Sequence, residues 1–357
     1  MQIKKIELNN FRNYDNQNIE LINGINLFVG DNAQGKTNII ESIYICALGK
    51  SYRTLKDDEV INFKADFSNI TLNYLKNGLE NKIELYIDKL NRKVLKKNDV
   101  KINKLIDHVG EIPIVIFSPD SLDIVKGAPG KRRKFIDMIC SQLSKSYLIN
   151  LQEYNKILKN KNSLLKQDYI DDEYLNIINE QMSKYIKNIV SYRKDIIYKL
   201  NEKAKIIEKK ITGEKEDIDV EYISDFIDMS EIEIKNILAK YSNIEKIRKA
   251  SLKGIQRDDI SILVNGLEVS KFGSQGQNRT ALLVLKLSDF EVIKEEKEET
   301  PILLLDDIMS ELDSTRIGFL LKYIENYQSV ITTTDSNFVK DVENIKISKV
   351  LNGTLEI

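Results

Sequence analysis

LFVGDNAQGKTNIIESIY, residues 27–44, joins an apolar run that ends at Gly30 to a loop, after which Lys36 and Thr37 open a predicted helix. The spacing fits GxxxxGK[ST], a loop in which backbone N–H groups and the positive end of a helix dipole converge on phosphate. The preceding apolar run and the following helical pattern are the context that this motif needs. The expected nucleotide contacts are Gly30, Asp31, Asn32, Ala33, Gln34, Gly35, Lys36, Thr37 and Asn38.

A second stretch, ILLLDDIMSELD at residues 302–313, places Asp306 and Asp307 at the end of a strongly apolar strand. Ligand sites of open α/β sheets gather at the carboxyl ends of such strands. An isolated acid pair could simply end a strand, but together with the phosphate loop it predicts an NTPase. In this interpretation Thr37 and Asp306 hold Mg2+, and Lys36 reaches the β and γ phosphates. Asp307 lies where a second acid polarises the attacking water.

The composition of the chain limits its class. A length of 357 residues suggests about two domains. With a net charge of -1, the overall field neither recruits nor repels nucleic acid, so any DNA site must be a local cluster. Cys46 and Cys140 lie in apolar-rich segments and indicate buried thiols in a reducing compartment. Because we find no signal segment and no apolar run of about 20 residues, we expect a cytoplasmic protein without a membrane segment.

The chain contains segments with β-like patterns and segments with helical periodicity, which predicts an α/β fold whose mixed sheet is interrupted by a helical arm. Residues 1–117 contain short β-like runs and one helix, and long helical periodicity begins at Pro129. Residues 173–211 would extend at most ~58 Å as a helix. Their apolar stripe suits an antiparallel partner helix. The stripe comprises Leu175, Ile178, Met182, Tyr185, Ile189, Tyr192 and Ile196. The expected segments are 1–117 and 255–357 for the sheet domain and 118–254 for the arm.

A third feature, FGSQGQNRT at residues 272–280, places small residues before a long apolar helix. In isolation a loop cap explains it equally well. Its position, some 30 residues before the acid strand, resembles that of the ABC-ATPase signature motif. The stretch SELD at residues 310–313 resembles the D-loop that trails the acid strand in the same class. The candidate signature residues are Ser274, Gln275, Gly276 and Gln277.

Several further motifs run in order along the whole chain. They are LNNFRNY at 8–14, KSYRT at 50–54, FSPDSLDIVKGAPGKRRKFID at 117–137 and RDD at 257–259. Together with the phosphate loop, the signature and the acid strand, they closely resemble the RecF family. This family belongs to the structural-maintenance-of-chromosomes and Rad50 branch of ABC ATPases. The resemblance implies an ABC-type P-loop ATPase head with a mixed β-sheet and an inserted short antiparallel helical arm.

The resemblance also implies a function in DNA replication, recombinational repair and the SOS response. Such a protein binds ATP with Mg2+, forms an ATP-dependent head-to-head homodimer, and binds duplex DNA at gaps and single-strand/double-strand junctions. With RecO and RecR partners it promotes recombinase loading. The signature of one chain, Ser274 to Gln277, would complete the nucleotide site of the other in trans. By analogy, Arg12 and Asn13 would lie near the nucleotide.

The chain departs from related patterns in ways that predict slow hydrolysis. Gln256 stands where RecF sequences usually have histidine, so any role of that histidine is in doubt here. Thr332 to Thr334 follow the next strand, where many ABC transporters carry a switch histidine, and Ser118 replaces the Q-loop glutamine. The only histidine, His108, lies far off in sequence, and we expect it to be an ordinary surface or loop residue.

Two basic runs are candidate DNA contacts, although a solvated face explains either one as well. Neither shows aromatic interleaving, which favours contact with the duplex backbone over base stacking. The first run comprises Lys126, Lys131, Arg132, Arg133 and Lys134. The second comprises Arg92, Lys93, Lys96 and Lys97.

Three alternative functions compete with this interpretation. The missing switch histidine and Q-loop glutamine argue against an ABC-transporter ATPase, and the short arm argues against a long-armed chromosome-organising ATPase. An ATP-gated DNA scaffold or clamp without meaningful turnover fits as well as a weak DNA-dependent ATPase. Asp307 favours the scaffold, because many ABC enzymes carry the longer glutamate there and a shorter acid lies farther from the water.

Overall fold

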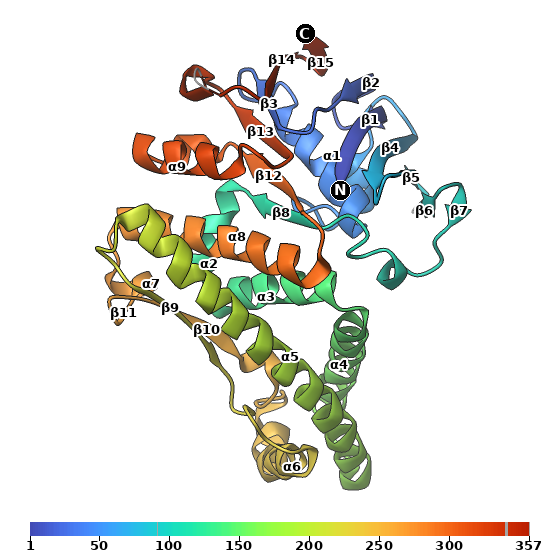
Figure 1. The fold of residues 1–357 in the computed structure, drawn as a ribbon. Helices are drawn as coiled ribbons and strands as arrows, with labels where there is room; N and C mark the ends of the chain where they lie inside the picture. The colour runs from blue at the N-terminus through green and yellow to red at the C-terminus, as the bar shows by residue number, and fades with distance from the viewer. Residues whose placement is uncertain (91, 340–341, 357) are drawn as a thin grey trace. The chain divides into compact units, whose positions relative to one another are not determined.

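The computed structural model describes residues 1–90, 92–339 and 342–356 (Figure 1). The chain divides into two compact units. The first comprises Met1–Ser121 and Asp289–Ile357, and the second Leu122–Ser288. Residues 255–288, which we expected in the sheet domain, lie in the second unit because β10 pairs with β9 and packs on α3 there.

The first unit contains an antiparallel sheet in the order β2-β1-β4-β5-β6-β7. Its inner face is apolar at alternate positions, as Ile70, Leu72 and Tyr74 of β4 show, and its outer face carries polar residues. The strands are β1 (Gln2–Phe11), β2 (Tyr14–Glu20), β4 (Phe67–Lys76), β5 (Leu79–Asp88), β6 (Lys93–Lys97) and β7 (Val100–Lys101).

The second sheet of this unit has the order β15-β14-β3-β13-β12-β8, and its strands run parallel except for the edge strand β15. Every residue of β12 and β13 is buried, which explains why neither sequence alternates apolar with charged residues as a half-exposed strand does. The strands are β3 (Ile25–Val29), β8 (Ile114–Phe117), β12 (Ile302–Asp306), β13 (Ser329–Thr333), β14 (Ile345–Leu351) and β15 (Thr354–Glu356).

Helix α1 (Lys36–Leu48) lies between the two sheets (Figure 1) and contacts β1, β4 and β5 on one side and β12 and β13 on the other. All residues from 39 to 48 are buried, so the helix is buried on every side rather than on one face only. It ends at Gly49, whose φ of 71° is the left-handed cap conformation. Because β3 precedes α1 and β13 separates β3 from β12, the parallel order brings the phosphate loop and the acid pair to the same sheet edge.

Short helical elements complete the first unit. The helix α9 (Ser314–Ile324) is capped at its N-terminus by Asp313, whose side chain accepts a hydrogen bond from the Arg316 backbone N–H. The 3-10 turns are η1 (Asp57–Val60), η2 (Leu105–Asp107), η3 (Pro119–Leu122), η5 (Ile308–Glu311) and η6 (Asn337–Val339), of which η3 runs one residue into the second unit.

The second unit is built around α5 (Asp172–Thr212), which packs against α4 and α6. Five residues of the expected stripe are buried, but Tyr185 and Tyr192 are only half buried. Ile186, Val190 and Ile197 are buried in addition, because α5 covers two neighbouring helices instead of one. The helices are α2 (Asp123–Lys126), α3 (Pro129–Leu143), α4 (Lys145–Leu164), α6 (Glu231–Arg248), α7 (Val269–Phe272) and α8 (Gln275–Lys297). The division between the units falls within α8.

A small sheet and two buried ion pairs join these helices. The sheet has the order β11-β10-β9, with β9 at Ile218–Ile223, β10 at Asp259–Val264 and β11 at Leu267–Glu268. Arg193 of α5 is buried and binds Asp137 at 2.7 Å and Asp258 at 2.8 Å. Lys161 of α4 lies 2.7 Å from Glu245 of α6, and both side chains are fully buried. No helix in the described ranges is long and apolar enough to cross a membrane.

Candidate nucleotide site

The phosphate loop leaves β3 at Gly30 and enters α1 after Gly35. A Cβ on Gly30 would collide with the carbonyl oxygen of Val350, and one on Gly35 would lie 2.7 Å from the Asn13 amide. Gly35 also has a φ of 116°, which L side chains rarely adopt. Glycine is therefore required at both ends of the loop. Between them, Asp31, Asn32 and Ala33 are exposed, and Gln34 is half buried.

Lys36 is buried and its ammonium is directed back into the loop. It donates to the carbonyl oxygen of Gly30 and, at 3.2 Å, to that of Asp31. Burial lowers the pKa of Lys36, and the nearby carboxylates of Asp307, Asp31 and Asp306 partly offset this shift. The Lys36 ammonium is thus hydrogen-bonded to two carbonyl oxygens, and a phosphate could take their place as its partner.

Asp306, at the end of β12, accepts hydrogen bonds from three hydroxyl groups. Oδ1 accepts from Thr37 at 2.8 Å and from Thr332 at 2.9 Å, and Oδ2 accepts from Tyr52 at 2.9 Å. Thr37 and Asp306, the two expected metal ligands, are therefore in direct contact. A hydroxyl and a carboxylate are the hard oxygen donors that Mg2+ prefers, so this pair fits the ion.

Asp307 begins the turn after β12 with a φ of 51°, a left-handed backbone that few non-glycine residues adopt. Its N–H donates to the Thr332 hydroxyl at 3.1 Å. Its Oδ1 is buried and has no hydrogen-bond partner among the described residues. Burial raises the pKa of Asp307, while Lys36 lowers it and Asp306 raises it further. A buried carboxylate oxygen without a donor fits a site that a water molecule or a hydrated metal completes.

Arg12 and Asn13 lie beside this loop, and side chains connect them to it. The Asn13 amide donates to the Gln34 carbonyl at 2.9 Å, and the Asn38 amide donates to Asn13 at 2.7 Å. Arg12 forms two hydrogen bonds, at 2.9 and 2.6 Å, to the carboxylate of Glu41. Gln34 also accepts from the C-terminal hairpin, through the N–H groups of Asn352 at 2.6 Å and Gly353 at 3.0 Å.

Glu41, Tyr52, Arg53 and Thr332 belong to this network, and sequence reasoning gave them no role. Glu41 is fully buried within α1 and also binds Arg53 at 3.0 Å and the Ser51 hydroxyl. The signal that could have found it is one acid inside an otherwise apolar helix, because a buried carboxylate needs cationic partners. Arg53 also donates to Asn38 at 2.7 Å, which closes the ring of contacts around the loop.

The four candidate signature residues lie at the start of α8 in the second unit. The Ser274 N–H donates to the Gln277 side chain at 2.9 Å, and the Gln277 N–H donates to the Ser274 hydroxyl at 3.1 Å. This reciprocal pair is a capping box. Gln277 also donates to Glu216 at 2.9 Å.

Comparison with known proteins agrees with this geometry. A family model for the AAA domain matches residues 5–316. The DNA replication and repair protein RecF of Clostridium perfringens (strain SM101 / Type A) is 42% identical over 360 residues, covering 100% of both chains. The same-named protein of Clostridium botulinum (strain Eklund 17B / Type B) is 42% identical over 366 residues, covering 99% of both.

The chain belongs to the RecF family. A solved structure of the recombination mediator protein RecF-ATPrS in the RecFOR pathway matches with a TM-score of 0.92 at 34% identity, covering 99% of this chain and 97% of that one. RecF-ATP of the same pathway matches with a TM-score of 0.91. An Smc head bound to the C-winged helix domain of ScpA, at 15% identity and a TM-score of 0.60, shares the fold. The expected ABC-type head is thereby confirmed.

Gln256 is half buried, whereas His108 is buried. Gln256 accepts a hydrogen bond from Tyr154 and donates to the Lys253 carbonyl at 3.1 Å. His108 lies in a turn, but its side chain is buried, so the expectation of a surface position was wrong. Its Nε2 lies 2.5 Å from the Cys46 carbonyl oxygen, and burial lowers its pKa. Both cysteines of the chain are buried and free, as expected.

The first basic run contributes both exposed and internal residues. Lys126 and Lys134 are exposed, and Lys131 pairs with Asp123 at 3.0 Å. Arg133 donates to the Asp258 carbonyl at 2.8 Å. Arg132 is buried, and its guanidinium binds both carboxylate oxygens of Asp259, at 2.7 and 2.9 Å. Arg132 thus fastens α3 to β10.

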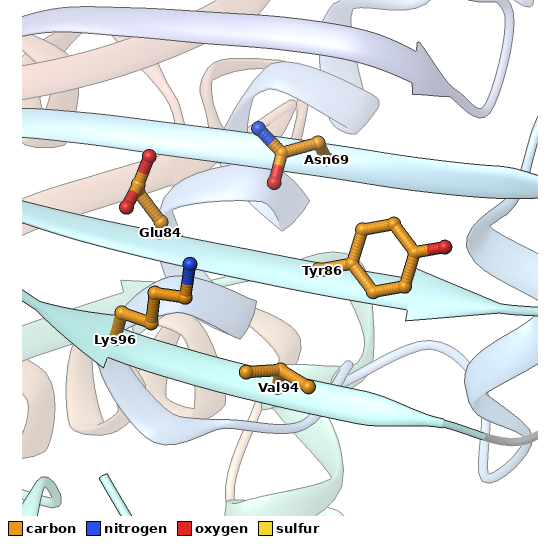
Figure 2. A pocket seen from close by; sticks show the side chains of 5 residues that line it. All are labelled: Asn69, Glu84, Tyr86, Val94 and Lys96. Carbon is orange, nitrogen blue, oxygen red and sulfur yellow. The ribbon is translucent and has the colours of Figure 1, made fainter. Parts of the chain in front are cut away.

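The second basic run lies along β6, where acids neutralise most of it. Arg92 pairs with Asp88 at 2.8 Å, Lys93 with Asp57 at 2.6 Å and Lys97 with Glu111 at 2.6 Å. Lys96 faces Glu84 across a strand pair, in a hollow of 280 Å³ on the outer face of the antiparallel sheet (Figure 2). The hollow is lined by Asn69, Glu84, Tyr86, Val94 and Lys96. This mixed charge makes the second run a poor candidate for phosphate contact.

Proposed function

We propose that this chain is an ATP-gated DNA-binding protein of replication and recombinational repair. ATP and Mg2+ join two copies head to head, and the dimer binds duplex DNA at gaps and single-strand/double-strand junctions. With RecO- and RecR-type partners it promotes recombinase loading and the SOS response. The observation that carries this proposal is the 2.8 Å contact between Thr37 and Asp306 beside the buried ammonium of Lys36. The names of the similar proteins, which cite repair, ATP and the RecFOR pathway, support it.

The residues divide the work as their chemistry suggests. Lys36 exchanges its carbonyl partners for the β and γ phosphates, whose charge it neutralises. Thr37 and Asp306 would hold Mg2+, which supplies a positive charge between the phosphate oxygens. Asp307 orients the attacking water. In the partner copy, Ser274 to Gln277 present a helix N-terminus, which suits the γ phosphate.

For DNA we propose phosphate contacts by the residues of the first basic run that reach the surface. Lys126, Lys131 and Lys134 lie at the end of α2 and in the first turns of α3. Arg133 is half buried, and we include it as a weaker contributor. Arg132 is excluded because its buried ion pair with Asp259 occupies its guanidinium. Binding through phosphates weakens steeply with salt and carries little sequence preference.

The experiment that tests this function is sedimentation velocity on wild type and Lys36→Met. Each protein is run with ATP and Mg2+, with and without a gapped duplex. We expect dimers for wild type only, strengthened by the gapped duplex, because methionine removes the phosphate-binding charge. A wild type that stays monomeric under every condition would contradict ATP-gated dimerisation.

A second candidate is an ATP-gated clamp that scarcely turns over. The geometry of Asp307 favours it, since this acid is short and its Oδ1 has no described donor to aim it at a water. The two candidates differ only in hydrolysis, so one rate measurement separates them.

A further inference from the structure

We infer that Tyr52 is a positioning residue that orients Asp306 for the metal, and that Ser51 and Arg53 fix Tyr52 by binding the buried carboxylate of Glu41. This inference rests on the proposed function, because it concerns the same nucleotide site. It connects the carboxylate of Asp306, which we propose as a metal ligand, to the carboxylate of Glu41 in α1. The three residues 51–53 are called the strap below.

The strap binds two carboxylates with consecutive side chains. Ser51 and Arg53 both donate to Glu41, whose side chain is fully buried. Tyr52, between them, donates to Oδ2 of Asp306 at 2.9 Å. A backbone held on both sides of Tyr52 leaves its ring little freedom, so the position of the phenol is set by Glu41.

The position of the Tyr52 ring is also fixed by a contact with a second aromatic ring. It packs edge-on against Tyr44 of α1, with ring centroids 5.0 Å apart. A phenol with its ordinary pKa of about 10 keeps its proton across the physiological range. It is therefore a permanent donor to the carboxylate.

This donor helps to fix the orientation of the Asp306 carboxylate plane. With Oδ2 held by Tyr52, Oδ1 is directed at Thr37 and Thr332. Without the phenol, the carboxylate could rotate about its terminal torsion, which is broad for aspartate. Hydrogen bonds to a ligating carboxylate commonly change metal affinity by about 10- to 100-fold. The strap thus preorganises the metal ligand before the metal arrives.

The test compares Tyr52→Phe with Tyr74→Phe. Both changes remove one tyrosine hydroxyl bonded to a carboxylate in the same unit, since Tyr74 donates to Glu111 at 2.8 Å. Phenylalanine keeps the contact of ring 52 with Tyr44. Mn2+, which is detectable by electron paramagnetic resonance, replaces Mg2+ in titrations with adenylyl-imidodiphosphate. Nucleotide binding is measured separately in EDTA, and thermal unfolding reports the fold of each variant.

We expect Tyr52→Phe to bind Mn2+ about 10-fold more weakly than wild type, with nucleotide binding in EDTA unchanged. Tyr74→Phe should match wild type in both assays, and Ser51→Ala should fall between because Arg53 still holds Glu41. Wild-type Mn2+ affinity in Tyr52→Phe would overturn the inference. An equal loss of nucleotide binding in EDTA would also overturn it, since Tyr52 would then support the loop instead of the metal ligand. Failure of wild type to bind any nucleotide would overturn the proposed function as well.

Discussion

Asp306 is bound by neutral donors, whereas Glu41 is bound by two cations and one hydroxyl. Three hydroxyl groups bind Asp306, and two guanidinium groups bind Glu41. Hydroxyl groups compensate a carboxylate only partly, so Asp306 retains a negative charge that can attract Mg2+. The two arginines more than neutralise Glu41 and leave one positive charge beside the phosphate loop. The site therefore offers a negative charge at Asp306 for the metal and, separately, a positive charge near Glu41 for the phosphates.

The role of Asp307 is tested by Asp307→Asn, which keeps the shape of the side chain and removes its charge. We expect ATP-dependent dimers to persist, because the phosphate and metal contacts are untouched. Single-turnover hydrolysis should fall about 100-fold or more if Asp307 acts as the base. Rapid-quench kinetics with ATP measures the hydrolysis rate, and sedimentation velocity with ATP measures dimer formation. An unchanged hydrolysis rate would mean that Asp307 is not the base.

His108 predicts a pH dependence of stability. Burial lowers its pKa in the folded state, so the unfolded chain takes up the proton first as the pH falls through about 6.5. The stabilisation is present above that value, and we expect it to be lost progressively as the pH falls below it. Urea unfolding of wild type and His108→Gln across this range measures it. Since the chain has one histidine, the variant should lack this component, and parallel curves would contradict the assignment.

At the scale of elements, buried charges join helices that are far apart in sequence. Lys161 and Glu245 connect α4 to α6, and Arg193 connects α5 to α3 and to the turn before β10. Such pairs contribute little net stability but are costly to break, because one charge is left buried alone. They specify which helices become neighbours within the second unit.

Lys161→Met should lower the free energy of unfolding by about 3 kcal/mol, because it leaves Glu245 buried without its cation. Lys159→Met is the matched control, since it lies on the same helix with an exposed side chain, and it should change stability by at most about 0.5 kcal/mol. Urea denaturation of the full chain measures both. Equal effects of the two substitutions would mean that burial of this ion pair is not what stabilises the helix contact.

The predictable parts of this protein are those that depend on local spacing. The phosphate loop and the acid strand are recognisable because each motif is contiguous. Partners separated by long stretches gave no signal, as with Tyr52 and Asp306 or Arg132 and Asp259. Arg132 belongs to a basic run, yet it is buried in an ion pair with Asp259, which lies 127 positions later. Residues 255–288 were assigned to the sheet domain because β-like runs resume there, whereas pairing with β9 places them in the second unit.

At the scale of the whole molecule, the net charge of -1 means that the DNA binding we propose would depend on a local basic patch. We expect Lys126→Ala and Lys134→Ala each to reduce the slope of log affinity against log salt by about 1, because each removes one released counterion. Lys210→Ala, which removes an exposed lysine at the end of α5, serves as the charge-matched control and should leave the slope unchanged. Fluorescence anisotropy with a gapped duplex at several salt concentrations measures this. Equal slopes for all three variants would place the DNA contact elsewhere.

The order of strands around β3 also has a consequence for synthesis. Its two neighbours are β13 and β14, and Gln34 is tied to the hairpin that follows β14. Ribosomes add roughly 5–20 residues per second, so on the order of 15–60 s pass between the emergence of β3 and that of β13. During that time the nascent chain carries the complete phosphate-loop sequence without the strands that shape it. A polypeptide released before β13 emerges should therefore be unable to capture nucleotide.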